Sequence, residues 1–122
     1  MLTDAQIEQA IQSLKLKDAL HEHNDCVRIA YAWLDAQVNT QGATRTTRPL
    51  KHLIEKWGGR YVSQSDVEVA AHLHPKIRGK YPHYNISSRL TEPSTERLTG
   101  VSEAFTQDYR SGHAPKNYKI HE

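Results

Sequence analysis

The 122-residue chain falls inside the usual size range of one domain, long enough to bury a core and too short for two cores of ordinary size. Hydrophobic residues make up 37% and charged residues 25% of the composition, with six glycines and five prolines, which excludes a disordered or fibrous chain. The formal net charge of +2 does not by itself exclude any class of partner. The distribution of charge along the chain, described below, is more informative.

The start of the chain predicts neither export nor membrane insertion. Residues 1–10 lack the basic start and apolar middle of a signal peptide, and the longest uncharged apolar stretch falls well short of the roughly 20 residues that span a bilayer. The single cysteine, Cys26, cannot form an internal disulfide, which agrees with a reducing compartment. We therefore expect a cytoplasmic protein with no membrane partner.

Two helices are predicted in the first third of the chain. Thr3 can cap a helix over residues 4–16, in which apolar side chains recur at helical spacing. Residues 25–38 carry apolar side chains on more than one helix face. Such a helix is typically central, because neighbours contact it on several sides.

A loop and a third helix follow. Residues 39–48 have no apolar periodicity and are rich in threonine, so they indicate a loop. Pro49 suits the first turn of a helix, where its missing amide hydrogen has no partner to lose. The apolar stripe of this helix consists of Leu50, Leu53, Ile54 and Trp57. Gly58 and Gly59 supply the left-handed geometry that ends it.

A fourth helix is predicted to begin at a capping box. Ser65 and Glu68 have the spacing at which each side chain bonds the other residue's backbone amide. The helix is expected to end near His74, because Pro75 disfavours its continuation. Its expected buried residues are Val67, Ala70 and Ala71.

The C-terminal part completes a mainly α domain. Residues 76–84 indicate a basic loop, and residues 85–90 indicate a short fifth helix. A sixth helix is predicted from the apolar side chains of Leu98, Val101, Phe105 and Tyr109. Any β structure is limited to one short hairpin near 60–63. Residues 111–122 show no pattern and predict an extended or mobile tail. The expected fold is a single domain of five to six helices over residues 1–110.

Residues 65–90 resemble a helix-turn-helix unit. The sequence SQSDVEVAAHL corresponds to the supporting helix and YNISSRL to the recognition helix, with Ile86 and Leu90 holding the second helix against the core. The link over residues 74–82 is longer than the usual turn of three or four residues, which a winged-helix relative or an unrelated helical bundle tolerates. The resemblance implies DNA recognition, and a purely structural helix pair is the alternative.

Positive charge gathers around this unit. Residues 45–90 carry nine basic and three acidic side chains, a net charge of +6, whereas residues 1–44 sum to −3 and residues 91–122 to −1. This segregation is typical of a surface that meets phosphates, and charges that point in many directions are the alternative. The side chains predicted to position phosphates are Arg45, Arg48, Lys51, Lys56 and Arg60.

The predicted base-facing residues lie on the second helix of the unit. Asparagine and arginine have the best bidentate geometry for adenine and guanine edges. The residues expected to face bases are Asn85, Ser88 and Arg89. The preceding basic loop interleaves cations with rings that stack on bases or brace phosphates, namely Lys76, Arg78, Lys80, Tyr81 and His83.

Metal and enzyme motifs are absent from the sequence. The closest histidine pairs, such as His21 with His23, are two residues apart and diverge by about 200° on a helix. HEHND is not the HExxH zinc helix, and there is no phosphate-cradling, dinucleotide or nucleophile-elbow signature. We predict no catalytic residue, no cofactor and no metal ion.

Three functions remain open at this point. The first is a small DNA-binding protein, such as a transcriptional regulator or an accessory factor of a mobile element. A homodimer fits it, because two half-sites multiply specificity, although no leucine heptad marks an interface. The second is a protein-interaction module, an inhibitor or adaptor whose basic face binds an acidic protein. The third is a small histidine-using enzyme or a metal binder.

Overall fold

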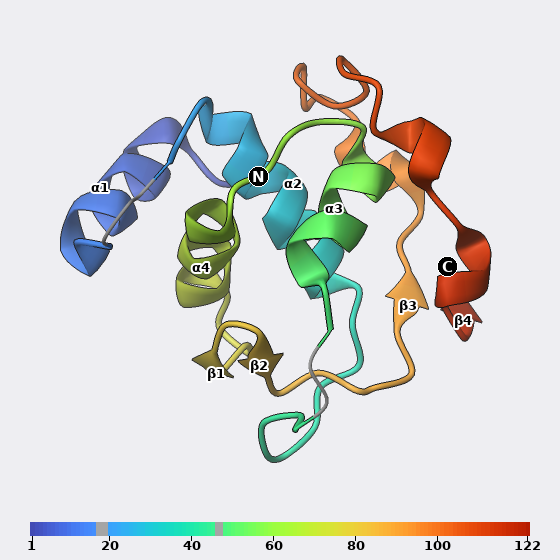
Figure 1. Cartoon of the computed structure of the whole chain (residues 1–122). Helices are drawn as coiled ribbons and strands as arrows, with labels where there is room; N and C mark the ends of the chain where they lie inside the picture. Colours follow the sequence, from blue (N-terminus) through green and yellow to red (C-terminus); the bar gives the residue numbers. More distant parts are fainter. Residues whose placement is uncertain (17–19, 46–47) are drawn as a thin grey trace.

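The computed structural model describes residues 1–16, 20–45 and 48–122 (Figure 1). Its α-helices are α1 (Asp4–Leu14), α2 (Asn24–Asp35), α3 (Leu50–Gly58) and α4 (Gln64–Leu73). Its strands are β1 (Gly79–Lys80), β2 (His83–Tyr84), β3 (Thr91–Glu92) and β4 (Ile120–His121). The described part is a single, mainly helical domain as predicted, but with four α-helices in place of the expected five to six. None of these helices is long and apolar enough to cross a membrane.

The strands form two separate pairs. β1 and β2 make an antiparallel hairpin with Gly79 opposite Tyr84, whereas β3 and β4 pair in parallel with Thr91 opposite Ile120. In Figure 1 the hairpin lies below α4 and the parallel pair lies on the right. The hairpin predicted near residues 60–63 was therefore placed wrongly in the sequence.

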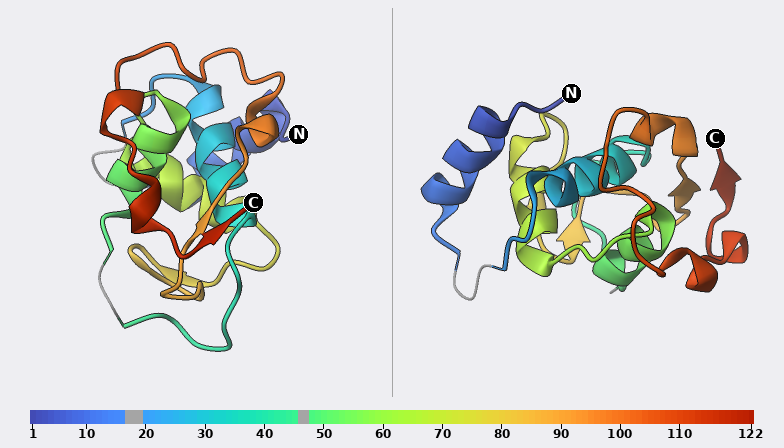
Figure 2. Two further views of the ribbon diagram at one scale, coloured as in Figure 1. Left: turned by 90° about the vertical axis from the view of Figure 1, so that its right-hand side faces the viewer. Right: turned by 90° about the horizontal axis from the view of Figure 1, so that it is seen from above.

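Helix α2 is central, as predicted. It contacts α1, α3 and α4, and Figure 2 shows it between the other helices when the molecule is viewed from above. Val27, Ile29 and Trp33 are fully buried along it. Even the indole nitrogen of Trp33 finds a partner, because it donates to the Tyr118 hydroxyl at 3.0 Å. This helix is the framework on which the other elements pack.

The local signals of α1 and α3 are confirmed. The Thr3 hydroxyl accepts from the Gln6 amide at 3.2 Å, which caps α1. The predicted apolar stripe of α3 is buried, and Gly59 ends the helix in the left-handed region with φ 63°. Pro49 differs slightly from the prediction, because it precedes the first helical residue.

The capping box of α4 lies two residues before its predicted place. The Ser63 hydroxyl accepts from the Asp66 amide, and the Asp66 carboxylate accepts from the Ser63 amide, both at 3.0 Å. Glu68 instead pairs with Gln64 along the surface of the helix. The predicted buried face and the end of α4 before Pro75 are confirmed.

Replacing Ser63 with alanine should therefore lower the free energy of unfolding by about 1 to 2 kcal/mol, the cost of losing a buried N-cap. Ser63 is buried, and its hydroxyl also donates to the Leu20 carbonyl. Ser65→Ala is the matched control, because the Ser65 hydroxyl also donates to the Leu20 carbonyl, at 2.9 Å, but caps no helix. Urea denaturation followed by circular dichroism measures both variants. An equal or larger loss for Ser65→Ala would contradict this assignment.

The predicted fifth helix over residues 85–90 is wrong. This segment is irregular, with one β-bridge at Ile86, because its backbone bonds the loop that follows α2 and not its own preceding turn. The Asn85 carbonyl accepts from the Thr40 amide at 2.9 Å, and the Ser87 amide donates to the Val38 carbonyl at 2.8 Å. No recognition helix of a helix-turn-helix unit is present in this segment.

The predicted sixth helix is also wrong. Residues Thr95–Leu98 form a single 3₁₀ turn, after which Gly100 adopts φ 86° and Phe105 φ 64°. Left-handed residues at this spacing interrupt a right-handed helix. The chain then returns along α3 to the β3–β4 pair through two further 3₁₀ turns, Arg110–Gly112 and Pro115–Asn117. The segment predicted as a tail thus reaches the core.

Candidate nucleic-acid interface

Two segments far apart in the sequence form one layer at the end of the molecule that carries the β-hairpin (Figures 1 and 2). The loop after α2 bonds the hairpin and the irregular segment that follows it. The Thr44 amide donates to the Tyr84 carbonyl at 3.0 Å, and Asn39 forms a β-bridge with Ile86. We call the cationic side chains of this layer the basic end: Arg45, Arg48, Lys76, Arg78, Lys80 and Arg89.

The basic end has no carboxylate of its own. The sequence contains no Asp or Glu between Asp35 and Glu55, or between Glu68 and Glu92. Among the residues that the structure describes, the ion pairs of lysine and arginine are formed by other side chains, namely Arg28, Lys51, Arg60 and Arg97. The positive charge of the basic end is therefore not neutralised by contacts within the described chain.

Two arginines of the basic end also join its segments. Arg48 donates to the Ser88 carbonyl at 2.8 Å, and Arg78 donates to the Gln41 carbonyl at 3.2 Å. The Arg48 Nε is buried without a hydrogen-bond partner in the described part of the chain. Carbonyl contacts leave the guanidinium charge in place, so both arginines can still attract an anion.

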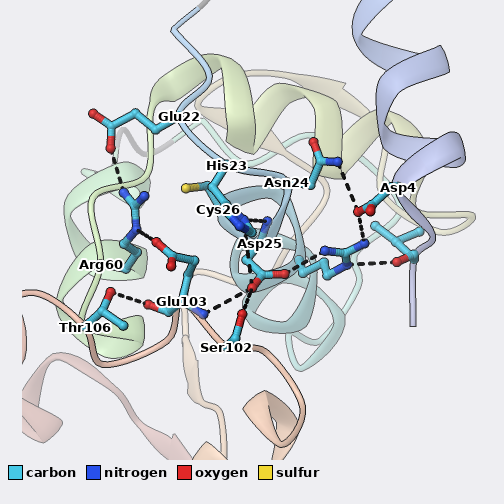
Figure 3. Close-up of polar contacts among 12 residues, drawn as sticks. Asp4, Glu22, His23, Asn24, Asp25, Cys26, Arg60, Ser102, Glu103 and Thr106 are labelled. Carbon is cyan, nitrogen blue, oxygen red and sulfur yellow. Dashed lines mark hydrogen bonds and ion pairs between the residues drawn. The ribbon is translucent and has the colours of Figure 1, made fainter.

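Three of the predicted phosphate-positioning residues lie elsewhere. Arg60 is buried and bonds Glu22 at 2.7 Å and Glu103 at 2.9 Å (Figure 3). Lys51 pairs with Glu55 at 3.0 Å. Lys56 is half-buried on α3, where its side chain runs past Gly112. The prediction that Arg60 positions phosphates is corrected by its burial and its two carboxylate partners.

Asn85 does not face outward from a helix. Its side chain is buried, accepts from the Arg78 amide at 2.6 Å and donates to the Lys76 carbonyl at 3.0 Å and the Thr40 carbonyl at 3.3 Å. All of the hydrogen bonds that it makes hold the layer together. Asn85 thus braces the hairpin against the loop, which corrects its predicted role as a reader of base edges.

The remaining predicted residues lie on or beside the basic end. Ser88 and Arg89 are exposed. His83 is half-buried, with Nδ1 2.9 Å from the Thr44 carbonyl. Tyr81 is half-buried, and its hydroxyl accepts from the Lys51 amide at 3.2 Å, so its ring is held between the hairpin and α3.

The chemistry of the basic end is that of an anion-binding surface. No protein-family profile, curated protein or solved structure matches the chain. Clustered cations in general attract phosphates electrostatically, and arginine binds phosphates through two parallel hydrogen bonds.

Several histidines and the cysteine are engaged in structural contacts. His74 lies 2.7 Å from Asp35, and His113 and His121 both contact the Glu92 carboxylate. In the described ranges no group of three or more His, Cys, Asp and Glu side chains is placed to hold a metal ion. Burial raises the pKa of the Cys26 thiol to about 12, so this thiol is not poised as a nucleophile.

The sequence analysis missed the contribution of the loop after α2. Gln41 and Thr44 supply carbonyls that position Arg78 and His83, although nothing in their residue types marks them. The available signal was the shared lack of carboxylates in the loop and in the hairpin segment. Two acid-free stretches that each carry cations are most stable when they face solvent or an anion.

Proposed function

We propose that the basic end binds nucleic acid through its phosphates. The observation that carries the proposal is the pairing of two distant, acid-free segments into one layer whose residues include six cations. Phosphate contacts supply most of the affinity in such surfaces, because each contact releases condensed counterions. A protein partner would need an equally dense array of carboxylates.

The mode of binding follows from the shape of this end. Its described residues form loops and a hairpin of two two-residue strands, without an α-helix that can enter the major groove of a duplex. Contacts to the backbone therefore dominate, and Arg89 with Ser88 offers the few groups able to reach a base edge. Binding through backbone contacts is typical of an accessory factor that holds nucleic acid, and less so of a regulator that reads duplex sequence.

Charge reversal tests the proposal. Fluorescence anisotropy with labelled single-stranded and duplex 20-mers should show that Arg78→Glu with Lys80→Glu weakens binding by about tenfold or more, because two attractive contacts become repulsive. The matched control is Lys116→Glu with Lys119→Glu, which changes the net charge equally at exposed positions of the C-terminal segment. The control should change binding less than twofold.

Salt dependence gives a second measurement on the same protein. If all six cations contact phosphates, log affinity should fall against log salt with a slope of about −4 for a single strand. Absence of binding at low salt, or equal losses for the two double variants, contradicts the proposal. Displacement by polyglutamate as effective as displacement by unlabelled oligonucleotide would instead favour the acidic-protein partner.

A further inference from the structure

A groove opens beside the basic end, between α4 and the β-hairpin. It has a volume of about 520 Å³, within the range of small-molecule sites. Leu14 and Ile77 form part of its apolar wall. Its polar and aromatic lining includes Glu68, Lys80, Tyr81 and Tyr84. Lys80 belongs to both the groove and the basic end, so a ligand in the groove lies next to the phosphate-binding surface.

The Tyr84 side chain lines this groove and ends in a hydroxyl. Tyr84 is only 3% exposed, and its hydroxyl has no hydrogen-bond partner among residues 1–16, 20–45 and 48–122. Burial, followed by the charges of Glu68 and Tyr81, raises the pKa of Tyr84 above its ordinary value. Because Tyr84 lines the groove together with Glu68 and Tyr81, its hydroxyl can serve as a donor to a ligand that binds there.

Glu68 gives the groove a preference for hydrogen-bond donors. Its Oε1 accepts from Gln64 at 2.9 Å, whereas its Oε2 has no partner in the described part of the chain. An ionised carboxylate only accepts hydrogen bonds, so it favours a ligand with an amino group. Thymine and uracil lack such a group, whereas cytosine, adenine and guanine carry one.

The aromatic side chains favour a planar ligand. The rings of Tyr81 and Tyr84 meet edge to face with their centroids 6.3 Å apart, and the Tyr81 hydroxyl is held by the Lys51 amide. A ring fixed in this way offers a rigid surface for stacking, and stacking on aromatic side chains is how proteins hold unpaired bases. A base in a duplex is paired and stacked, so it cannot enter.

We propose that this groove accepts one amino-bearing base of a single-stranded nucleic acid whose phosphates lie on Lys80 and Arg78. The inference rests on the proposed function of the basic end and names its substrate class. The hydroxyl of Tyr84 and the free oxygen of Glu68 bind the edge of the base, and Tyr81 packs against its face.

Three labelled 12-mers test the inference by fluorescence anisotropy: oligo(dC), oligo(dT) and an abasic strand with the same phosphates. Wild-type protein should bind oligo(dC) at least fivefold more tightly than the abasic strand, with oligo(dT) between them. Tyr84→Phe keeps the ring and removes only the hydroxyl, so it should fold normally and weaken oligo(dC) binding about threefold to tenfold. Binding of the abasic strand should not change.

Glu68→Gln provides the second variant, since an amide can also donate. It should narrow the preference for oligo(dC) over oligo(dT), whereas Glu8→Gln, at an exposed position of α1, should leave that preference intact. Equal wild-type affinity for oligo(dC) and the abasic strand overturns the base site while leaving the phosphate surface standing. Failure to bind any of the three strands at low salt overturns the proposed function and this inference together.

Discussion

Replacing Asp25 with alanine should lower the free energy of unfolding by about 3 kcal/mol, the cost typical of breaking a buried charged network. The Asp25 carboxylate is buried at the start of α2 and accepts from Arg28 at 2.6 Å, from the Ser102 hydroxyl at 3.0 Å and from the Glu103 amide at 3.1 Å (Figure 3). Removing it leaves these donors without an acceptor. It also detaches the loop after the 3₁₀ turn from the helix.

Urea denaturation followed by tryptophan fluorescence measures this loss. Asp108→Ala is the matched control, because Asp108 is exposed and its carboxylate makes no hydrogen bond or ion pair in the described residues. Its stability should stay within about 0.5 kcal/mol of wild type, as is usual for surface sites. A loss below about 1 kcal/mol for Asp25→Ala would show that the network contributes little.

The same carboxylate predicts a dependence of stability on pH. Burial opposes ionisation of Asp25, but hydrogen bonds from Arg28, Glu103 and Ser102 outweigh it and lower its pKa below the ordinary 3.8. A depressed pKa in the folded state contributes stability that is complete above the ordinary value and is lost as pH falls through the folded value. Thermal unfolding should therefore show the difference between wild type and Asp25→Ala shrinking below about pH 4.

The helices that depend on their own residues were predictable. The cap of α1 at Thr3 and the stripe of α3 ending at Gly59 need only neighbours within a few positions. The cap of α4 was missed because two serines, Ser63 and Ser65, precede acidic residues at the same spacing. Both hydroxyls donate to the Leu20 carbonyl, 43 and 45 residues away, but only Ser63 is buried, and that burial depends on tertiary packing.

The irregular segment after the hairpin was not predictable in the same way. The apolar residues of this segment fit a short helix. Its backbone instead bonds the loop after α2, 45 positions away at Thr40 and Asn85, and these bonds replace those of a helical turn. Asn85 shows the consequence, because an asparagine on a helix faces solvent, whereas here its amide satisfies three backbone groups. Pairing at this sequence distance leaves no periodic trace in a single sequence.

The basic end was predictable in part. Counting charges locates the cationic segment, but only tertiary contacts decide which cations stay unpaired. Lys51 and Glu55 are four apart on a helix, so their pairing could be inferred from spacing. Arg60 pairs with Glu22 and Glu103, 38 and 43 residues away, and no local rule connects them.

Tyr118 carries the second large effect that we expect. Its side chain is 3% exposed, its hydroxyl accepts from the Trp33 indole, and its ring lies 5.9 Å from that of His113. Tyr118→Ala should lower the free energy of unfolding by about 3 kcal/mol, as for other buried aromatic truncations. Tyr118→Phe removes only the hydroxyl and should cost about 1 kcal/mol.

The two Tyr118 variants also test whether the C-terminal segment, residues 111–122, is packed against the domain or mobile. One buried side chain leaves no apolar periodicity, so residues 111–122 resemble a tail in the sequence, although β4 pairs with β3 and Glu122 pairs with Arg97. Trypsin should cut at Lys116 and Lys119 much faster in Tyr118→Ala than in wild type, because the segment then opens without global unfolding. Equal cleavage rates and equal stability would mean that the anchor does not hold the segment, and the tail prediction would stand.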